Sequence, residues 1–289
     1  MNVKLLNRIA WEIFADKIYR AHGSGVKKLV EGYKALVRND NNKELAVHKK
    51  SYNEMSNEEF SNRVSGIQKV SGFSLEGYQE LRGGNILLAF LKNDVEKFQI
   101  DGNQIQDYLI VGNSHDGSSG FFLGTSTHFL RCENEFARLK RFVSIRHTSG
   151  ADERMEEFMH YFIQYVNNRQ KMYKKFNQFG EVIVSDEVRE QMALYILSLH
   201  KEEKLDEISD SQKAKLNLVH NCIDEEITDL GDNLWGLFNG ITRYTTHHVN
   251  ARTPVFGNAL GGKATTNNRA FNFAEEVLKT GSAVKLIKA

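Results

Sequence analysis

The sequence predicts an α+β fold, in which an antiparallel β-meander over about residues 70–132 is packed by the helices that follow from residue 135. Two observations indicate this fold. Short apolar runs separated by turn residues fill the first stretch, and apolar residues recur at helical spacing in the second. With 289 residues, of which 40% are hydrophobic and 26% charged, the chain is long enough to bury a sizeable core.

The first 68 residues are predicted to form a basic, helical N-terminal region that precedes an α+β domain over 69–289. Apolar residues at helical spacing predict helices over 3–20 and about 26–38. Ser56 and Glu59 have the spacing of a capping box, which predicts a short helix over 57–68. Residues 1–50 carry 11 Lys and Arg against 5 Asp and Glu. Several of these cations either contact phosphate or simply face water: Lys27, Lys28, Lys34, Lys49 and Lys50.

The meander is read from turns. Gly83 and Gly84 precede the apolar run Ile86–Leu91, which has the length of a strand. The pair Asp101-Gly102 is a strong hairpin turn before a strand over Ile105–Val111. The stretch Tyr108–Cys132 then reads as a strand, a polar turn and a longer strand, and the rest of the chain is expected to be organised around it.

After Cys132 the pattern becomes helical. Helical segments are predicted over 137–147, 152–176, 188–200, 213–227, 233–247 and 268–279, with a glycine-containing loop over 253–266.

The net charge of +1 hides an uneven distribution. Residues 243–289 carry 7 Lys and Arg against 2 acids, whereas residues 186–232 carry 5 against 13. This asymmetry indicates either a polyanion-binding face opposite an acidic one or solvated helix surfaces of differing sign. Cys132 and Cys222 make neither a disulfide framework nor a metal pair. No apolar run reaches 18 residues and no secretory signal is present, so the chain is expected in the cytoplasm, without a membrane partner.

The polar turn holds the densest set of reactive side chains. His115 beside Asp116 is typical of a general base or a metal ligand. The alternative is turn chemistry, because Asn, Asp, Ser and Gly populate hairpin turns for backbone reasons. A catalytic site would draw on His115, Asp116, His147 and His247. No two candidate ligands have a metal-binding spacing, and no phosphate loop or nucleophile elbow is present, so no metal or cofactor is predicted.

A basic and aromatic set points to single-stranded DNA, where stacking and phosphate neutralisation act together. The aromatic members are Phe121, Phe122, Phe129 and Phe142, and the predicted nucleic-acid-binding residues are Arg131, Arg138, Lys140, Arg141, Arg146, His147, Arg243, Arg252, Lys263 and Arg269. The alternative is that the phenylalanines fill the core while the cations are solvated.

On the segment over 233–247, four side chains recur at i, i+4 intervals: Trp235, Asn239, Arg243 and His247. This stripe is either a ligand-facing edge or a structural polar network beside the apolar face.

Together these segments resemble the phage/plasmid-like protein family, a domain of unknown function found on phages, prophages and plasmids. The resemblance covers roughly residues 70–280. The residues that carry it are Asn113, Ser114, His115, Asp116, Gly117 and Ser118, then RCEN ending at Asn134, RHT at 146–148, and LWGLFNGITRYTTHH at 234–248 with Trp235 and Asn239. The chain departs from the family pattern at Glu133, where a smaller or amide residue is expected, and at Gly240, where an alanine is expected.

The resemblance implies a role in mobile-element DNA metabolism and brings no settled activity. The leading hypothesis is a non-enzymatic DNA-binding protein, an oligomer that anneals single strands or assists recombination; its fold-level analogy is to single-strand annealing proteins. The second is a metal-assisted hydrolase or nuclease using His115 and Asp116. The third is a protein-binding inhibitor of host defence that uses the acidic stretch 186–232.

Overall fold

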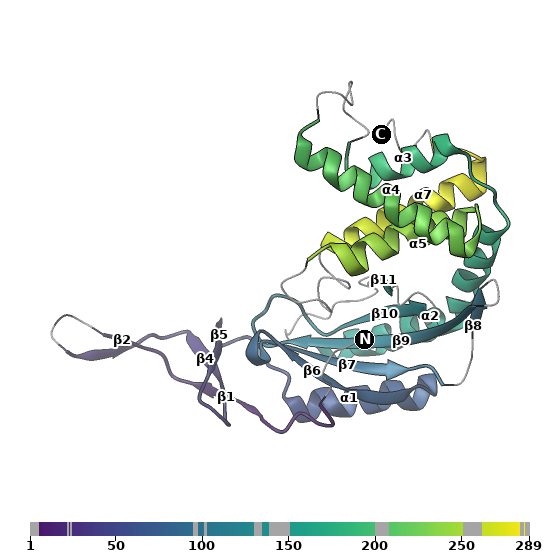
Figure 1. The fold of residues 1–289 in the computed structure, drawn as a ribbon. Coiled ribbons are helices and arrows are strands. Elements are labelled where there is room, and N and C mark those ends of the chain that lie inside the picture. Colours follow the sequence, from purple (N-terminus) through teal and green to yellow (C-terminus); the bar gives the residue numbers. More distant parts are fainter. Residues whose placement is uncertain are drawn as a thin grey trace. The chain divides into compact units, whose positions relative to one another are not determined.

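The computed structural model is α+β (Figure 1) and divides into two compact units. It describes residues 6–21, 23, 25–94, 98–100, 103–129, 135–138, 151–199, 208–250, 262–283 and 286. Unit 1 comprises residues 1–96, 108–124 and 140–166, and unit 2 comprises residues 97–107, 125–139 and 167–289. The domain boundary that the sequence predicts after residue 68 stays a prediction.

The N-terminal region of unit 1 is built of strands, which corrects the prediction of a helical basic arm. The strands are β1 (Ile13–Asp16), β2 (Tyr19–Ala21), β3 (Lys27–Leu29), β4 (Tyr33–Arg38) and β5 (Glu44–Lys49). They form a three-stranded sheet in the order β1-β4-β5 and a separate two-stranded ribbon, β2-β3.

The prediction of helices from apolar spacing was wrong because turn residues and strand pairing override that spacing. Gly32, inside the helix predicted over about 26–38, has a φ of +81°, which breaks that helix. Ala35, Leu36 and Val37 are all buried, as in a central strand covered on both faces. Local apolar spacing carries no information about this pairing.

The six-stranded sheet confirms the predicted meander. Its strands are β6 (Ser74–Leu81), β7 (Ile86–Lys92), β8 (Phe98–Ile100), β9 (Asn103–Ser114), β10 (Phe122–Phe129) and β11 (Glu135–Arg138), with a short 3₁₀ turn, η1 (Arg82–Gly84), between β6 and β7. The order is β11-β10-β9-β7-β6, and β8 pairs with β9. The described part of the segment predicted helical over 137–147 is strand β11, and the rest of that segment lies outside the described residues.

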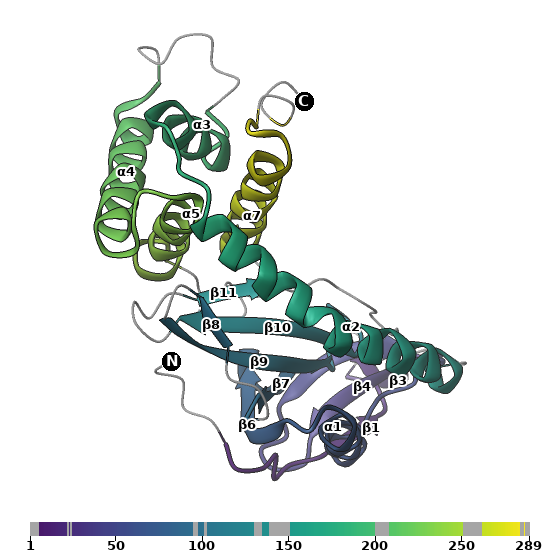
Figure 2. The same cartoon turned by 90° about the vertical axis from the view of Figure 1, so that its right-hand side faces the viewer.

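One face of the sheet in unit 1 is packed by helix α1 (Asn57–Ser71), as Figure 2 shows. Phe60, Val64 and Ile67 of α1 share a core cluster with alternate residues of β7 and β9. The predicted cap is present, because Ser56 Oγ accepts from the backbone N–H of Glu59 at 3.0 Å. On β9, Gly112 leaves room for the ring of Phe122, since a Cβ there would lie 2.0 Å from that ring.

Unit 2 gathers the helices that follow (Figure 2). They are α2 (Ala151–Gly180), which begins in unit 1, then α3 (Asp186–Ile196), α4 (Asp210–Leu230), α5 (Leu234–Arg243), a π-helical turn, η3 (Tyr244–His248), and α7 (Gly262–Thr280). The last helix starts within the predicted loop, so Lys263 belongs to a helix. No helix among the described residues is long and apolar enough to cross a membrane.

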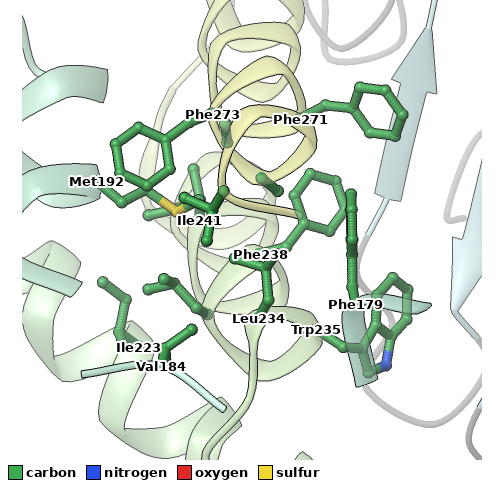
Figure 3. Close-up of a cluster of buried hydrophobic side chains, with 14 of the residues drawn as sticks. Phe179, Val184, Met192, Ile223, Leu234, Trp235, Phe238, Ile241, Phe271 and Phe273 are labelled. Atoms are coloured by element: carbon green, nitrogen blue, oxygen red, sulfur yellow. The ribbon is translucent and has the colours of Figure 1, made fainter. Parts of the chain in front are cut away.

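Helix α5 is the centre of unit 2. Every residue from Leu234 to Thr242 is buried, and Trp235 and Phe238 lie in an aromatic cluster with Phe179 and Phe271 (Figure 3). Gly240 explains the departure from the family pattern: a Cβ there would lie 2.5 Å from Cα of Ile223 on α4. The two helices therefore pack backbone to backbone at this point.

Candidate nucleic-acid interface

His115 is a buried core residue of unit 1 and only 1% exposed. Its Nε2 lies 3.1 Å from Asn57 Oδ1; because that oxygen only accepts, Nε2–H is the donor. The ring packs edge-on against Trp11 at 5.7 Å between centroids. Its backbone carbonyl accepts from His48 Nε2 at 2.8 Å. His115 thus joins β9, the first turn of α1 and strand β5.

Asp116 holds the turn itself. Its Oδ1 accepts from the backbone N–H of Ser118 at 2.9 Å, which is a local aspartate turn. Its Oδ2 lies 3.4 Å from Asn85 Nδ2 and 3.8 Å from Arg82 Nη1. Gly117 has a φ of +71°, the conformation that makes glycine useful there. These contacts fit the structural alternative for this turn.

The segment before β1 is locked to the same region. Trp11 Nε1 donates to Glu80 Oε1 at 2.5 Å, and Arg38 Nη1 donates to Glu80 Oε2 at 2.8 Å. The Arg38 guanidinium also lies 3.9 Å above the Trp11 ring and pairs with Asp40. A hydrogen bond from Arg38 holds the pKa of the Asp40 carboxyl below its usual value. This network fixes the base of the N-terminal strands.

The geometry gives the hydrolase hypothesis no support. Among the described residues no three His, Cys, Asp or Glu side chains are grouped so as to hold a metal. His247 is exposed on η3 in unit 2, and His147 lies outside the described residues.

Arg243, predicted to contact nucleic acid, is held by carboxylates. Its Nε pairs with Glu225 at 2.6 Å, and its Nη1 lies 3.3 Å from the buried Glu226. Burial lowers the pKa of the guanidinium, but the two carboxylates outweigh this effect and raise it above its ordinary value. Its charge is therefore neutralised within the fold.

Two further predicted cations also have local partners. Lys263 is buried and donates to the Thr246 carbonyl at 3.4 Å. Arg269 donates to the Tyr195 and Ile196 carbonyls at the end of α3, and lies 4.5 Å above the Tyr195 ring. Arg138 belongs to β11. The remaining predicted residues lie outside the described residues: Arg131, Asn134, Lys140, Arg141, Arg146, His147 and Arg252.

The Trp235 stripe is mostly internal. Asn239 is fully buried and donates from Nδ2 to the Trp235 carbonyl at 2.9 Å. Thr242 Oγ1 donates to the Asn239 carbonyl, and Thr245 Oγ1 lies 2.7 Å from Asn267 Oδ1 on α7. These contacts tie α5, η3 and α7 together as a structural polar network.

One group of cations that faces solvent lies on the β2-β3 ribbon, whose six residues are all exposed. Arg20 lies directly opposite Lys28, and Tyr19 lies opposite Leu29. Directly opposed side chains project from the same face of a ribbon, so two positive charges stand side by side. Tyr19 and Leu29 are 53% and 40% exposed. In the sequence, the signal for this hairpin is the pair Gly23 and Gly25 between two short basic segments.

The architecture is that of an α+β protein with a β-ribbon before the main sheet. The chain belongs to the DUF932 family, a domain of unknown function, whose model matches residues 44–270. Strands β1 to β4, and with them the ribbon, precede the matched residues. No curated protein matches the chain, and no solved structure does.

Proposed function

We propose that this protein binds nucleic acid through its N-terminal ribbon and serves the DNA metabolism of a phage or plasmid. Within that role we favour single-strand annealing or assistance to recombination, by an oligomer in the cytoplasm of the host cell. The phage and plasmid setting is supported by the family resemblance of the four motifs. The ribbon supports nucleic-acid binding.

The observation that carries the proposal is the exposed Arg20–Lys28 pair. Like charges directly opposed on two strands destabilise the pairing. An isolated two-stranded ribbon with no buried face is itself marginal in water. A polyanion bound across the pair removes the repulsion, because each cation then faces a phosphate.

The direct test is fluorescence anisotropy with labelled oligonucleotides across a series of salt concentrations, comparing the full chain with Arg20→Glu/Lys28→Glu. We expect the variant to lose about 100-fold or more in affinity at low salt, with a shallower salt dependence, because roughly two phosphate contacts are lost.

The matched control is Lys171→Glu/Lys174→Glu, the same change of charge at two exposed positions of α2. It should bind within a few-fold of the parent. Equal losses in both variants, or an unchanged ribbon variant, would refute a ribbon interface.

A further inference from the structure

We infer that the β2-β3 ribbon enters the major groove of duplex DNA, so that each of its two faces meets one of the phosphate backbones that border the groove. This inference rests on the proposed function and names its substrate class. For a protein that anneals single strands, the duplex is the product that the ribbon would hold.

The ribbon is the outer half of one long hairpin. Strand β1 runs into β2 and strand β3 runs into β4, and within each half the two strands pair antiparallel. The inner half also pairs with β5, and Arg38 at its base donates to Glu80 on β6. Among the described strands, β2 and β3 pair only with each other. The hairpin therefore has an anchored inner half and an outer half with no neighbouring strand on either side.

Both faces of this outer half carry positive charge. Arg20 and Lys28 are directly opposed and share one face, and Lys27 lies on the other face because side chains alternate along a strand. All three are exposed, and the six paired residues include no acid. Lys17 precedes the ribbon and Glu31 follows it, so these two charges offset one another. Each face of the ribbon therefore attracts a polyanion.

This distribution of cations favours a duplex over a single strand. One phosphate backbone that lies across Arg20 and Lys28 leaves Lys27 turned away from it. A groove of a duplex is bordered by two backbones, one along each wall. A ribbon that enters the groove edge-on places a face with a cation against each wall, and both faces then neutralise phosphate.

The thickness of the ribbon selects the groove. Stacked sheets lie about 10 Å apart, which is also the thickness of a ribbon with side chains on both faces. The major groove of B-form DNA is about 12 Å wide and admits a two-stranded ribbon, whereas the minor groove, about 6 Å wide, is too narrow. The major groove of an RNA duplex is deep and narrow, so the duplex that fits is DNA.

The two-sided contact is tested with Lys27→Glu, which changes only the face opposite to Arg20 and Lys28. By fluorescence anisotropy on duplex DNA, we expect a loss of about 10-fold in affinity at low salt and a salt slope shallower by about one, as for one phosphate contact. The matched control is Lys171→Glu, an exposed lysine of α2, which should bind like the parent. A Lys27→Glu chain that folds, by circular dichroism, and binds like the parent overturns the inference.

The groove is tested by methylation protection. Dimethyl sulfate methylates guanine at N7, an atom that faces the major groove. The bound parent chain should protect guanines of the duplex, and Arg20→Glu/Lys28→Glu at the same concentration should leave them reactive. Guanines that stay fully reactive under a bound parent chain overturn the inference.

Melting of the DNA itself separates this inference from the proposed function. A protein that binds a duplex more tightly than its separate strands raises the melting temperature of the DNA, and one that prefers the strands lowers it. We expect a rise, measured on a short duplex that melts below the unfolding temperature of the protein. If the parent chain binds no DNA at low salt, the proposed function fails. If it binds DNA and the melting temperature falls or does not change, the proposed function stands and the groove inference falls.

Discussion

The cations of the β2-β3 ribbon and of helix α5 lie in opposite environments, one exposed to solvent and the other paired with carboxylates. On the ribbon, Arg20 and Lys28 lie opposite one another, and both are exposed to solvent. On α5, Arg243 is neutralised by Glu225 and by the buried Glu226. The comparison teaches that a count of basic residues does not locate a polyanion site. What matters is whether the fold has already supplied the counter-charge.

The largest effect that sharpens this comparison is expected from Arg243→Ala. It leaves the Glu226 carboxylate buried without its guanidinium partner, so we expect a loss of roughly 2–3 kcal/mol in the free energy of unfolding by urea. Affinity for oligonucleotides should stay within a few-fold of the parent. Arg8→Ala, an exposed arginine of the same type, should change stability by less than about 0.5 kcal/mol. Weakened DNA binding by a folded Arg243 variant would contradict the comparison.

Gly240→Ala tests the packing of α5 from the backbone side. Because the added Cβ would lie 2.5 Å from Cα of Ile223, α4 and α5 must separate, and we expect a loss of about 1–2 kcal/mol in urea unfolding. The control is Gly66→Ala in helix α1, where the added Cβ meets nothing within 4 Å. That change should stabilise the chain by about 0.5–1 kcal/mol through helix propensity. If both substitutions change the free energy of unfolding in the same direction, the helices relax around the contact at Gly240 without loss of stability.

The smallest effect is expected in the ribbon. Arg20→Ala/Lys28→Ala removes the like-charge pair, so thermal stability should stay the same or rise, by less than about 1 kcal/mol, at low salt. The same variant should lose oligonucleotide affinity. A clear drop in stability would mean that these cations do support the fold, and the contrast with α5 would collapse.

The meander and the helices of unit 2 could be predicted because their signals are local. Ser56 and Glu59 mark the start of α1, the Asp101-Gly102 signal predicts the hairpin whose strands β8 and β9 pair, and the apolar spacing of α5 marks a buried helix. The N-terminal strands could not, since their pairing joins β4 to β1 and β5, and local apolar spacing does not encode that pairing.

The candidate site shows the same limit. His115 reads as a reactive side chain in sequence, but its partner Asn57 is 58 residues away, and no spacing rule connects the two. Lys28 is among the cations that the sequence analysis sets against phosphate or water, but Arg20 is not, and only the hairpin register makes the two neighbours. Neither unit's chemistry is visible until the pairing is known.

Three elements, β9, β10 and α2, each contribute residues to both units. Each unit is therefore assembled from three separate pieces of the polypeptide, so no single cut yields either of them intact. Expression fragments that stop between residues 97 and 166 would deprive both halves of hydrogen-bonded or packed chain. Deletion mapping of activity on this protein should accordingly rely on point substitutions in the full-length chain.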